Sequence, residues 1–228
     1  MVLIPRPIER GFEASLVPLV EWLIRRRVHP NLLTTIGTLI LVGSAVAWGA
    51  GEIRLGGFLL LLSGVFDMLD GRVARGSELA SRFGAFYDST LDRVGEAALF
   101  AGIAVYFMQG GVPSWLAVTA VCIAISALSF SLLVSYARAR AEGLGLECKV
   151  GIAQRAERIV GLGVPSLFFG AGPHGLLLLT IVTLLAVVAL VTVVQRIHHV
   201  YKATRTRKRT TMVGRVTPVV AEFQGKGK

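Results

Sequence analysis

The chain has 228 residues, of which 54% are hydrophobic and only 17% are charged, and its formal net charge is +10. Soluble domains carry about 25% charged residues, so the composition excludes a disordered chain, a fibrous protein and an ordinary water-soluble domain. It predicts an all-α, polytopic membrane protein, because about six spans of roughly 20 apolar residues fit into this length.

The first segment, residues 8–27, has the pattern of an amphipathic helix. Ile8, Phe12, Leu16 and Leu23 recur at helical spacing, and the basic run 25–27 ends the segment. Such a helix is typical of the membrane interface, where its apolar face enters the lipid. A short helix packed into the core is the alternative.

Apolar stretches follow that predict six transmembrane helices, at residues 32–50, 55–74, 83–108, 115–138, 159–171 and 176–197. The fifth reaches spanning length only if its helix begins earlier, near Gly151. We therefore predict three parts: an N-terminal interfacial helix at 1–30, a six-helix domain at 31–200 and a basic, loosely ordered tail at 201–228.

The distribution of Lys and Arg predicts the orientation of these spans in the cell membrane. The N-terminal segment, the loop after the second span, the loop at 138–158 and the tail are basic, whereas the other three connections share a single arginine, Arg54. Because positive loops stay on the cytoplasmic side, both termini are expected to be cytoplasmic.

Four carboxylates stand where an apolar span should have none. Asp67 and Asp70 share one face of the second span, and Asp88 and Asp92 share one face of the third. Acids in a membrane helix are costly and indicate a functional site by default. Because four converging acids would repel one another, they predict a metal site, and an all-carboxylate set suits Mg²⁺ or Mn²⁺ rather than Zn²⁺.

Two other interpretations of these acids remain open at this point. Neighbouring arginines could neutralise them in plain ion pairs; the arginines in question are Arg72, Arg75, Arg82 and Arg93. A divalent-cation transporter could also use them, although transporters place their sites near the bilayer midplane on broken helices. Here the acids gather toward the cytoplasmic ends of their spans.

The acids belong to a longer pattern, D-x-x-D-G-x-x-A-R-x8-G-x3-D-x3-D. Eight positions match it, namely Asp67, Asp70, Gly71, Ala74, Arg75, Gly84, Asp88 and Asp92. This pattern resembles that of the CDP-alcohol phosphotransferases, a family of integral membrane enzymes. Members transfer a phosphatidyl-type group from a CDP-linked lipid to the hydroxyl of an acceptor alcohol and release CMP.

The resemblance implies a role for each group of residues. It implies a two-ion centre of Mg²⁺ or Mn²⁺ held by Asp67, Asp70, Asp88 and Asp92. Asp92 would also be the general base that deprotonates the acceptor. The contacts with the CDP-lipid would come from Asn31, Leu32, Leu33, Thr34, Gly71, Arg75 and Ser81.

A second basic cluster indicates the acceptor. Four of its arginines lie between the fourth and fifth spans, namely Arg138, Arg140, Arg155 and Arg158. Guanidinium groups match phosphate oxygens, so the cluster favours a phosphorylated acceptor. Positive-inside topology alone is the alternative explanation for basic residues in this loop.

The same stretch resembles the phosphatidylinositol phosphate synthases of the family, which carry S-Y-x-K-A-R-A-E and R-P-E-R. Here Arg138 replaces the lysine and Ala156 the proline, while Arg196 matches an arginine at the end of the last span. The implied donor is CDP-diacylglycerol and the implied acceptor is 1D-myo-inositol 3-phosphate. Glycerol 3-phosphate and an ether-lipid CDP donor remain alternatives. A homodimer is implied by the family, and no nucleic acid partner is expected for the basic tail.

Overall fold

The structure is a computed structural model that describes residues 6–148, 150–151 and 155–224. Helices make up all of its regular secondary structure within those ranges, which confirms the predicted all-α class. The main helices are α1 (Arg6–Arg25), α2 (Pro30–Gly49), α3 (Ile53–Gly76), α4 (Arg82–Tyr106), α5 (Ser114–Gly143), α6 (Arg155–Phe169) and α7 (Leu176–Gln224). Two short turns join neighbours, the π-helical η1 (Phe107–Gly111) and the 3₁₀ helix η2 (Pro173–Gly175).

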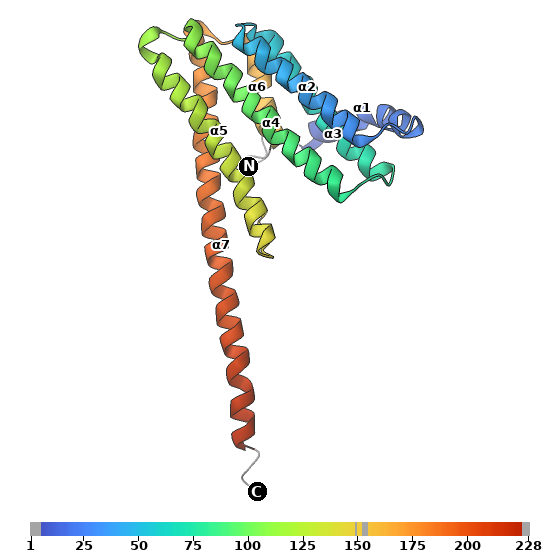
Figure 1. Ribbon diagram of the computed structural model, residues 1–228, viewed down its shortest axis with the longest axis vertical. Coiled ribbons are helices and arrows are strands. Elements are labelled where there is room, and N and C mark those ends of the chain that lie inside the picture. The colour runs from blue at the N-terminus through green and yellow to red at the C-terminus, as the bar shows by residue number, and fades with distance from the viewer. Residues whose placement is uncertain (1–5, 149, 152–154, 225–228) are drawn as a thin grey trace.

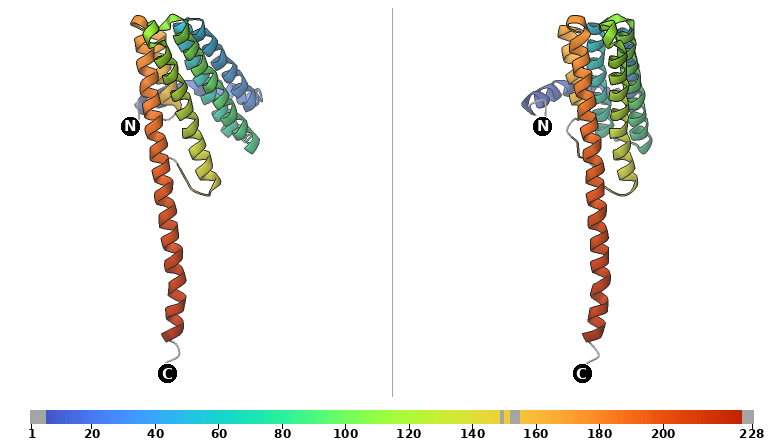
Figure 2. Two further views of the ribbon diagram at one scale, coloured as in Figure 1. Left: turned by 60° about the vertical axis from the view of Figure 1, so that its left-hand side comes forward. Right: turned by 90° about the vertical axis from the view of Figure 1, so that its left-hand side faces the viewer.

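The bundle has two packed groups. α2 packs against α3 and α4, and α3 also contacts α6, whereas α5 packs against α7 and α4. Figures 1 and 2 show these helices running side by side, with α1 lying across them. α4 therefore stands between the two groups, in contact with both α2 and α5.

The main core lies at the end of the bundle away from the aspartates. Trp48 is fully buried there, and its indole nitrogen donates a hydrogen bond to the carbonyl of Ile53 at 3.0 Å. This bond holds the α2–α3 connection tightly, because Trp48 ends one helix and Ile53 begins the next. A buried indole N–H needs such a partner to avoid an unpaired donor.

Helix α1 has one face packed on the protein and another exposed. Leu16 and Leu23 join a small buried cluster with residues of α2 and α3, while Val17, Leu19 and Trp22 are exposed. An exposed apolar face of this kind is compatible with the interfacial position that the sequence predicts.

Three helical segments within the described residues are long and apolar enough to cross a membrane: Pro30–Gly49, Ser114–Gly143 and Pro173–Arg205. The chain is thus a membrane protein. The other three predicted spans, α3, α4 and α6, do not meet these criteria. α3 and α4 carry several charged residues, and α6 has only 15 residues. The six-span arrangement remains a prediction.

The tail differs from the expectation of loose order. α7 continues without interruption to Gln224, and Figure 1 shows its C-terminal part extending past the other helices. For residues 198–213 the physical reason is local, since they contain neither Gly nor Pro and include good helix formers such as Lys, Arg and Ala; Gly214 and Pro218 lie within the last part of the helix.

Candidate active site

Helices α3 and α4 bring three aspartates together. Oxygen atoms of Asp67, Asp70 and Asp88 all lie within 4.8 Å of one another. Asp70 is the most deeply placed of the three, with 6% of its surface exposed. The spacing of three residues within α3 puts its two acids on one face, and the packing of α2 against both helices turns that face toward α4.

The fourth aspartate has a different environment. Asp92 is not part of the group of three, but it lines a small cavity of about 10 Å³ together with Asp67 and Asp70. Its Oδ2 atom also lies 3.6 Å from Nη2 of Arg93. The sequence predicts four carboxylates in one site. In the structure three of them form a close group, and Asp92 lies beside that group.

The donor set fits a divalent cation. Three carboxylates offer only oxygen ligands, which suit hard ions such as Mg²⁺ and Mn²⁺. Without a cation, three acids so close together would repel one another strongly in a partly dry site. The chemistry of the cluster thus agrees with the metal binding expected from the sequence.

A threonine of α2 orients one of these acids. Oγ1 of Thr34 donates a hydrogen bond to Oδ2 of Asp70 at 2.7 Å, and Thr34 itself is buried. α2 starts with Pro30 at its first turn, and the N–H of Asn31 donates to Nδ1 of His29, which caps the helix. This fixed helix start sets the position of Thr34 one turn later, so Thr34 orients Asp70, one of the predicted metal ligands.

Thr34→Val removes this hydroxyl while keeping the shape of the side chain. We expect the affinity for Mn²⁺ to fall about 10–100-fold, because groups that orient metal ligands contribute that much to affinity. A Mn²⁺ binding titration of the purified protein measures the change. Thr180→Val is the matched control, since that exposed hydroxyl bonds only the Leu176 carbonyl of its own helix in the described contacts. An unchanged Mn²⁺ affinity in Thr34→Val would contradict the role.

A groove of about 220 Å³ opens beside the aspartates. Five residues of the predicted CDP-lipid set line it, together with Asp70 and Asp88; the five are Asn31, Thr34, Gly71, Arg75 and Ser81. Ser81 also caps α4, accepting a hydrogen bond from the N–H of Gly84 at 2.9 Å. The remaining two residues lie elsewhere: Leu33 is buried in the α1–α2–α3 cluster, and Leu32 is 53% exposed.

The predicted acceptor arginines are spread over several positions. Arg138 forms an exposed ion pair with Glu142 (Nε to Oε1, 2.9 Å), and Arg140 is exposed near the end of α5. Arg196 of α7 donates to backbone carbonyls, that of Val150 at 3.0 Å and that of Val134. The side chain of Arg155 lies outside the described part of the chain.

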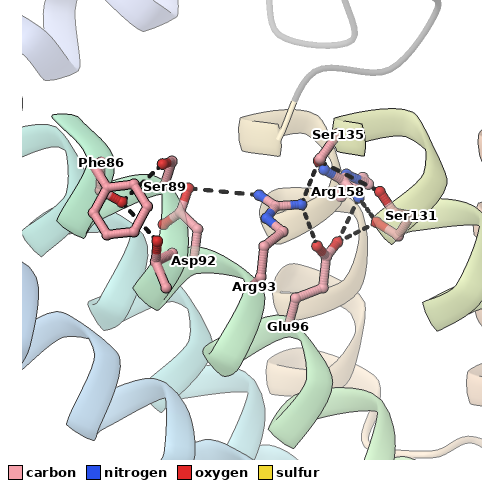
Figure 3. Close-up of polar contacts among 9 residues, drawn as sticks. Phe86, Ser89, Asp92, Arg93, Glu96, Ser131, Ser135 and Arg158 are labelled. Carbon is pink, nitrogen blue, oxygen red and sulfur yellow. Dashed lines mark hydrogen bonds and ion pairs between the residues drawn. The ribbon is translucent and has the colours of Figure 1, made fainter. Parts of the chain in front are cut away.

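Of the predicted acceptor arginines whose side chains are described, Arg158 is the one that the fold places near Asp92. It lines a cavity of about 40 Å³ together with Asp92 and Glu96. Its Nη1 atom pairs with Oε1 of Glu96 at 2.5 Å and also contacts the hydroxyl of Ser131. Figure 3 shows Arg158 and Arg93 on either side of Glu96.

The comparison with known families decides how this geometry is interpreted. Residues 27–161 match the sequence model of the family described as CDP-alcohol phosphatidyltransferase, and they include the four aspartates, the groove and Arg158. The chain belongs to this family. It is therefore a phospholipid-synthesising transferase, and the transporter interpretation of the aspartates is not supported.

Similar proteins carry more specific names. A phosphatidylinositol phosphate synthase of Cutibacterium acnes is 39% identical over 181 residues, 76% of this chain and 85% of that protein. An archaetidylinositol phosphate synthase of Methanothermobacter thermautotrophicus is 39% identical over 155 residues, 68% of this chain and 71% of that protein.

One enzyme with the same fold has been solved with two different sets of bound molecules. The phosphatidylinositol phosphate synthase of Mycobacterium tuberculosis with CDP-DAG bound is 32% identical, with a TM-score of 0.70, covering 81% of this chain and 92% of that one. The same enzyme in complex with manganese and citrate also superposes with a TM-score of 0.70, covering 81% of this chain and 88% of that one at the same identity. A divalent metal in this relative agrees with the aspartate cluster of the present chain.

Sequence reasoning missed Glu96. It follows Asp92 by one helical turn, and it sits in the apolar part of α4, where an acid already indicates a functional role. The rule that singled out the aspartates would have found it, but the family pattern ends at Asp92. Ser131 and Ser135 carried no signal, because hydroxyls are common in membrane helices.

Proposed function

We propose that this enzyme transfers the phosphatidyl group of CDP-diacylglycerol to 1D-myo-inositol 3-phosphate, giving phosphatidylinositol phosphate and CMP. The observation that carries the proposal is the position of Asp92. It lines one cavity with Asp67 and Asp70 and another with Glu96 and Arg158. A carboxylate between a metal cluster and an arginine suits a reaction between a diphosphate and a phosphorylated alcohol.

Asp67, Asp70 and Asp88 would hold the metal, with Asp92 completing a two-ion centre of Mg²⁺ or Mn²⁺. When bound, the ions would neutralise the diphosphate and stabilise the charge that develops on the departing CMP. Thr34 keeps the Asp70 carboxylate oriented for this task through its 2.7 Å hydrogen bond.

Asp92 is proposed to act as the general base. An Oδ atom of Asp92 would accept the proton of the acceptor hydroxyl as that oxygen attacks the phosphorus next to the diacylglycerol. Nη2 of Arg93 lies 3.6 Å from Oδ2 of Asp92, which places a positive charge beside this carboxylate. The proton transfer needs the acceptor hydroxyl within hydrogen-bond reach of Asp92, which the shared cavity with Arg158 allows.

The groove of about 220 Å³ is proposed to bind the CDP part of the donor. Arg75 would pair with the diphosphate, and Asn31, Gly71 and Ser81 would line the nucleotide's path. Leu32 would contact the acyl chains, since its side chain is exposed at the start of α2, and Leu33 supports the groove from the buried cluster beneath it. An ether-lipid donor remains the alternative, since one of the similar proteins is an archaetidylinositol phosphate synthase.

The acceptor phosphate is proposed to bind at the arginines between α5, α6 and α7. Arg158 is the central one because it shares a cavity with Asp92. Arg138, Arg140, Arg155 and Arg196 would attract the phosphate and close around it. Arg196 is already fixed by two backbone carbonyls, which reduces the conformational entropy lost on binding.

We further propose six spans, with both termini and the active site facing the cytoplasm and α1 in the membrane interface. The basic segments that flank the aspartate ends of α3 and α4 support this orientation. A homodimer is proposed from the family resemblance alone.

The function is tested by CMP release from purified protein in detergent, with CDP-diacylglycerol and Mg²⁺ or Mn²⁺. Inositol 3-phosphate, free inositol, glycerol 3-phosphate and serine are compared as acceptors. We expect release with inositol 3-phosphate and little with the other three. The arginines favour a phosphorylated acceptor over free inositol and serine, and the names of the similar proteins favour inositol phosphate over glycerol 3-phosphate. CMP release with glycerol 3-phosphate instead would support the proposed transfer reaction but contradict inositol 3-phosphate as its acceptor.

Arg158→Ala is expected to raise the KM for inositol phosphate by about 10–100-fold, since a charged hydrogen bond to phosphate contributes about 1.5–3 kcal/mol. The KM for CDP-diacylglycerol should stay within about twofold. Arg25→Ala is the control, because this arginine forms an exposed pair with Glu21 on α1. An equal rise in both KM values would contradict the assignment of Arg158 to the acceptor.

A further inference from the structure

Glu96 joins three helices at the edge of the site. Its Oε2 atom pairs with Nη1 of Arg93 at 2.6 Å, and its Oε1 atom pairs with Nη1 of Arg158 at 2.5 Å. Oε1 also accepts from the hydroxyl of Ser131 on α5. The Glu96 side chain is only 13% exposed, so these are largely desolvated contacts. Figure 3 shows the carboxylate at the centre of this network.

The network supplies a link that backbone packing does not. Among the described residues, α6 packs its backbone against α3 and α7, whereas α4 packs against α2 and α5. Arg158 reaches from α6 to Glu96 on α4 and to Ser131 on α5. Arg93 continues the network on α4, binding Ser135 of α5 at 2.6 Å and lying beside Asp92.

Each carboxylate oxygen of Glu96 pairs with a different arginine, and this explains why an acid is needed at position 96. An amide at position 96 would keep one acceptor oxygen but would turn an NH₂ donor toward the other guanidinium. It would also leave two arginine charges close together without the anion between them, which is costly in a partly dry site. The length of the glutamate side chain matters too, because an aspartate is one methylene shorter and would hold its carboxylate farther from Arg93 and Arg158.

We propose that Glu96 is a positioning residue for the acceptor: it sets where the Arg158 guanidinium stands relative to the Asp92 carboxylate. This rests on the proposed function, since it takes Arg158 as the acceptor-phosphate ligand and Asp92 as the base. Asp92, Glu96 and Arg158 line one cavity, so a phosphate bound by Arg158 and a hydroxyl beside Asp92 would face the same space. Correct placement of two groups in this way raises rates by removing orientational freedom.

The test compares Glu96→Gln, Glu96→Asp and the matched acid-to-amide control Glu21→Gln, whose carboxylate lies in an exposed pair on α1. CMP release is measured while CDP-diacylglycerol and inositol phosphate are varied separately. We expect Glu96→Gln to raise the KM for the acceptor at least about tenfold, with the KM for CDP-diacylglycerol within about twofold of wild type. Glu96→Asp should show a smaller rise, and Glu21→Gln should behave as wild type.

Two further measurements separate positioning from general destabilisation. In an Arg158→Ala background, Glu96→Gln should cause little additional rise in the acceptor KM, because the residue through which it acts is already gone. Stabilisation of the protein against heat by inositol phosphate alone should weaken in Glu96→Gln and persist in Glu21→Gln. This second readout does not depend on turnover.

A lower kcat with both KM values unchanged would overturn the proposal, because that is the signature of a smaller active fraction. Full additivity with Arg158→Ala would overturn it as well. Failure of the proposed function looks different: the wild-type enzyme itself would then release no CMP with inositol phosphate and show no thermal stabilisation by it. If wild type prefers glycerol 3-phosphate, the same variants are measured with that acceptor. The expected result is the same: a higher KM for the acceptor and an unchanged KM for CDP-diacylglycerol.

Discussion

Asp67→Asn and Asp92→Asn are expected to abolish most of the CMP release, but for different reasons. Asp67 is one of three aspartates whose oxygens lie within 4.8 Å of one another, so under the proposed mechanism its loss removes a metal ligand. Asp92 stands beside that group and pairs with Arg93, so its loss would chiefly remove the proposed base. General base catalysis contributes about 10²–10⁴-fold, and we expect a loss of about 10³-fold in kcat for Asp92→Asn.

Direct Mn²⁺ binding distinguishes the two variants. Asp67→Asn should bind Mn²⁺ at least about 100-fold more weakly than wild type, because a direct ligand contributes more than the groups that orient it. Asp92→Asn should keep Mn²⁺ affinity at the three-aspartate group within about tenfold, because Asp92 lies outside that group and would lose at most the second ion, and it should still bind CDP-diacylglycerol. Glu52→Gln, at the exposed start of α3, is the acid-to-amide control. Equal loss of Mn²⁺ binding in both variants would contradict the separate role of Asp92.

Gly102→Ala is expected to cause a large loss of stability. At Gly102 the backbone of α4 lies against that of α2, and a methyl group built there would overlap the backbone carbonyl of Ala45. Because a backbone cannot rotate away as a side chain can, the two helices must separate. Overpacking costs about 1–3 kcal/mol, and we expect the upper end, about 3 kcal/mol.

Thermal unfolding in detergent measures this effect. Gly43→Ala is the matched control on α2, since a methyl group at position 43 would meet its nearest neighbour, Leu59, at an ordinary 3.9 Å. Replacement of a helix glycine by alanine then leaves stability unchanged or raises it slightly. A midpoint for Gly102→Ala equal to that of Gly43→Ala would show that α2 and α4 tolerate separation.

Helical structure and the metal site could be predicted because both depend on local spacing. Apolar runs and glycine turns marked the helices, and α2, α5 and the apolar part of α7 lie where three of the predicted spans were placed. Acids three or four residues apart share a helix face whatever the helix packs against. The family pattern around these acids then indicated the chemistry, which the family match confirms.

Contacts between distant helices could not be predicted, because helical periodicity says which residues share a face and not which faces meet. Thr34 reaches Asp70 across 36 positions, and Glu96 reaches Arg158 across 62. Leu33 was expected at the donor and lies in a buried cluster, since packing of α1 and α3 covers it. The sequence alone thus determined the helices, the membrane class and which acids form the candidate metal site. Only the tertiary structure decided which of the predicted acceptor arginines shares a cavity with Asp92, because that depends on how α4, α5 and α6 are brought together.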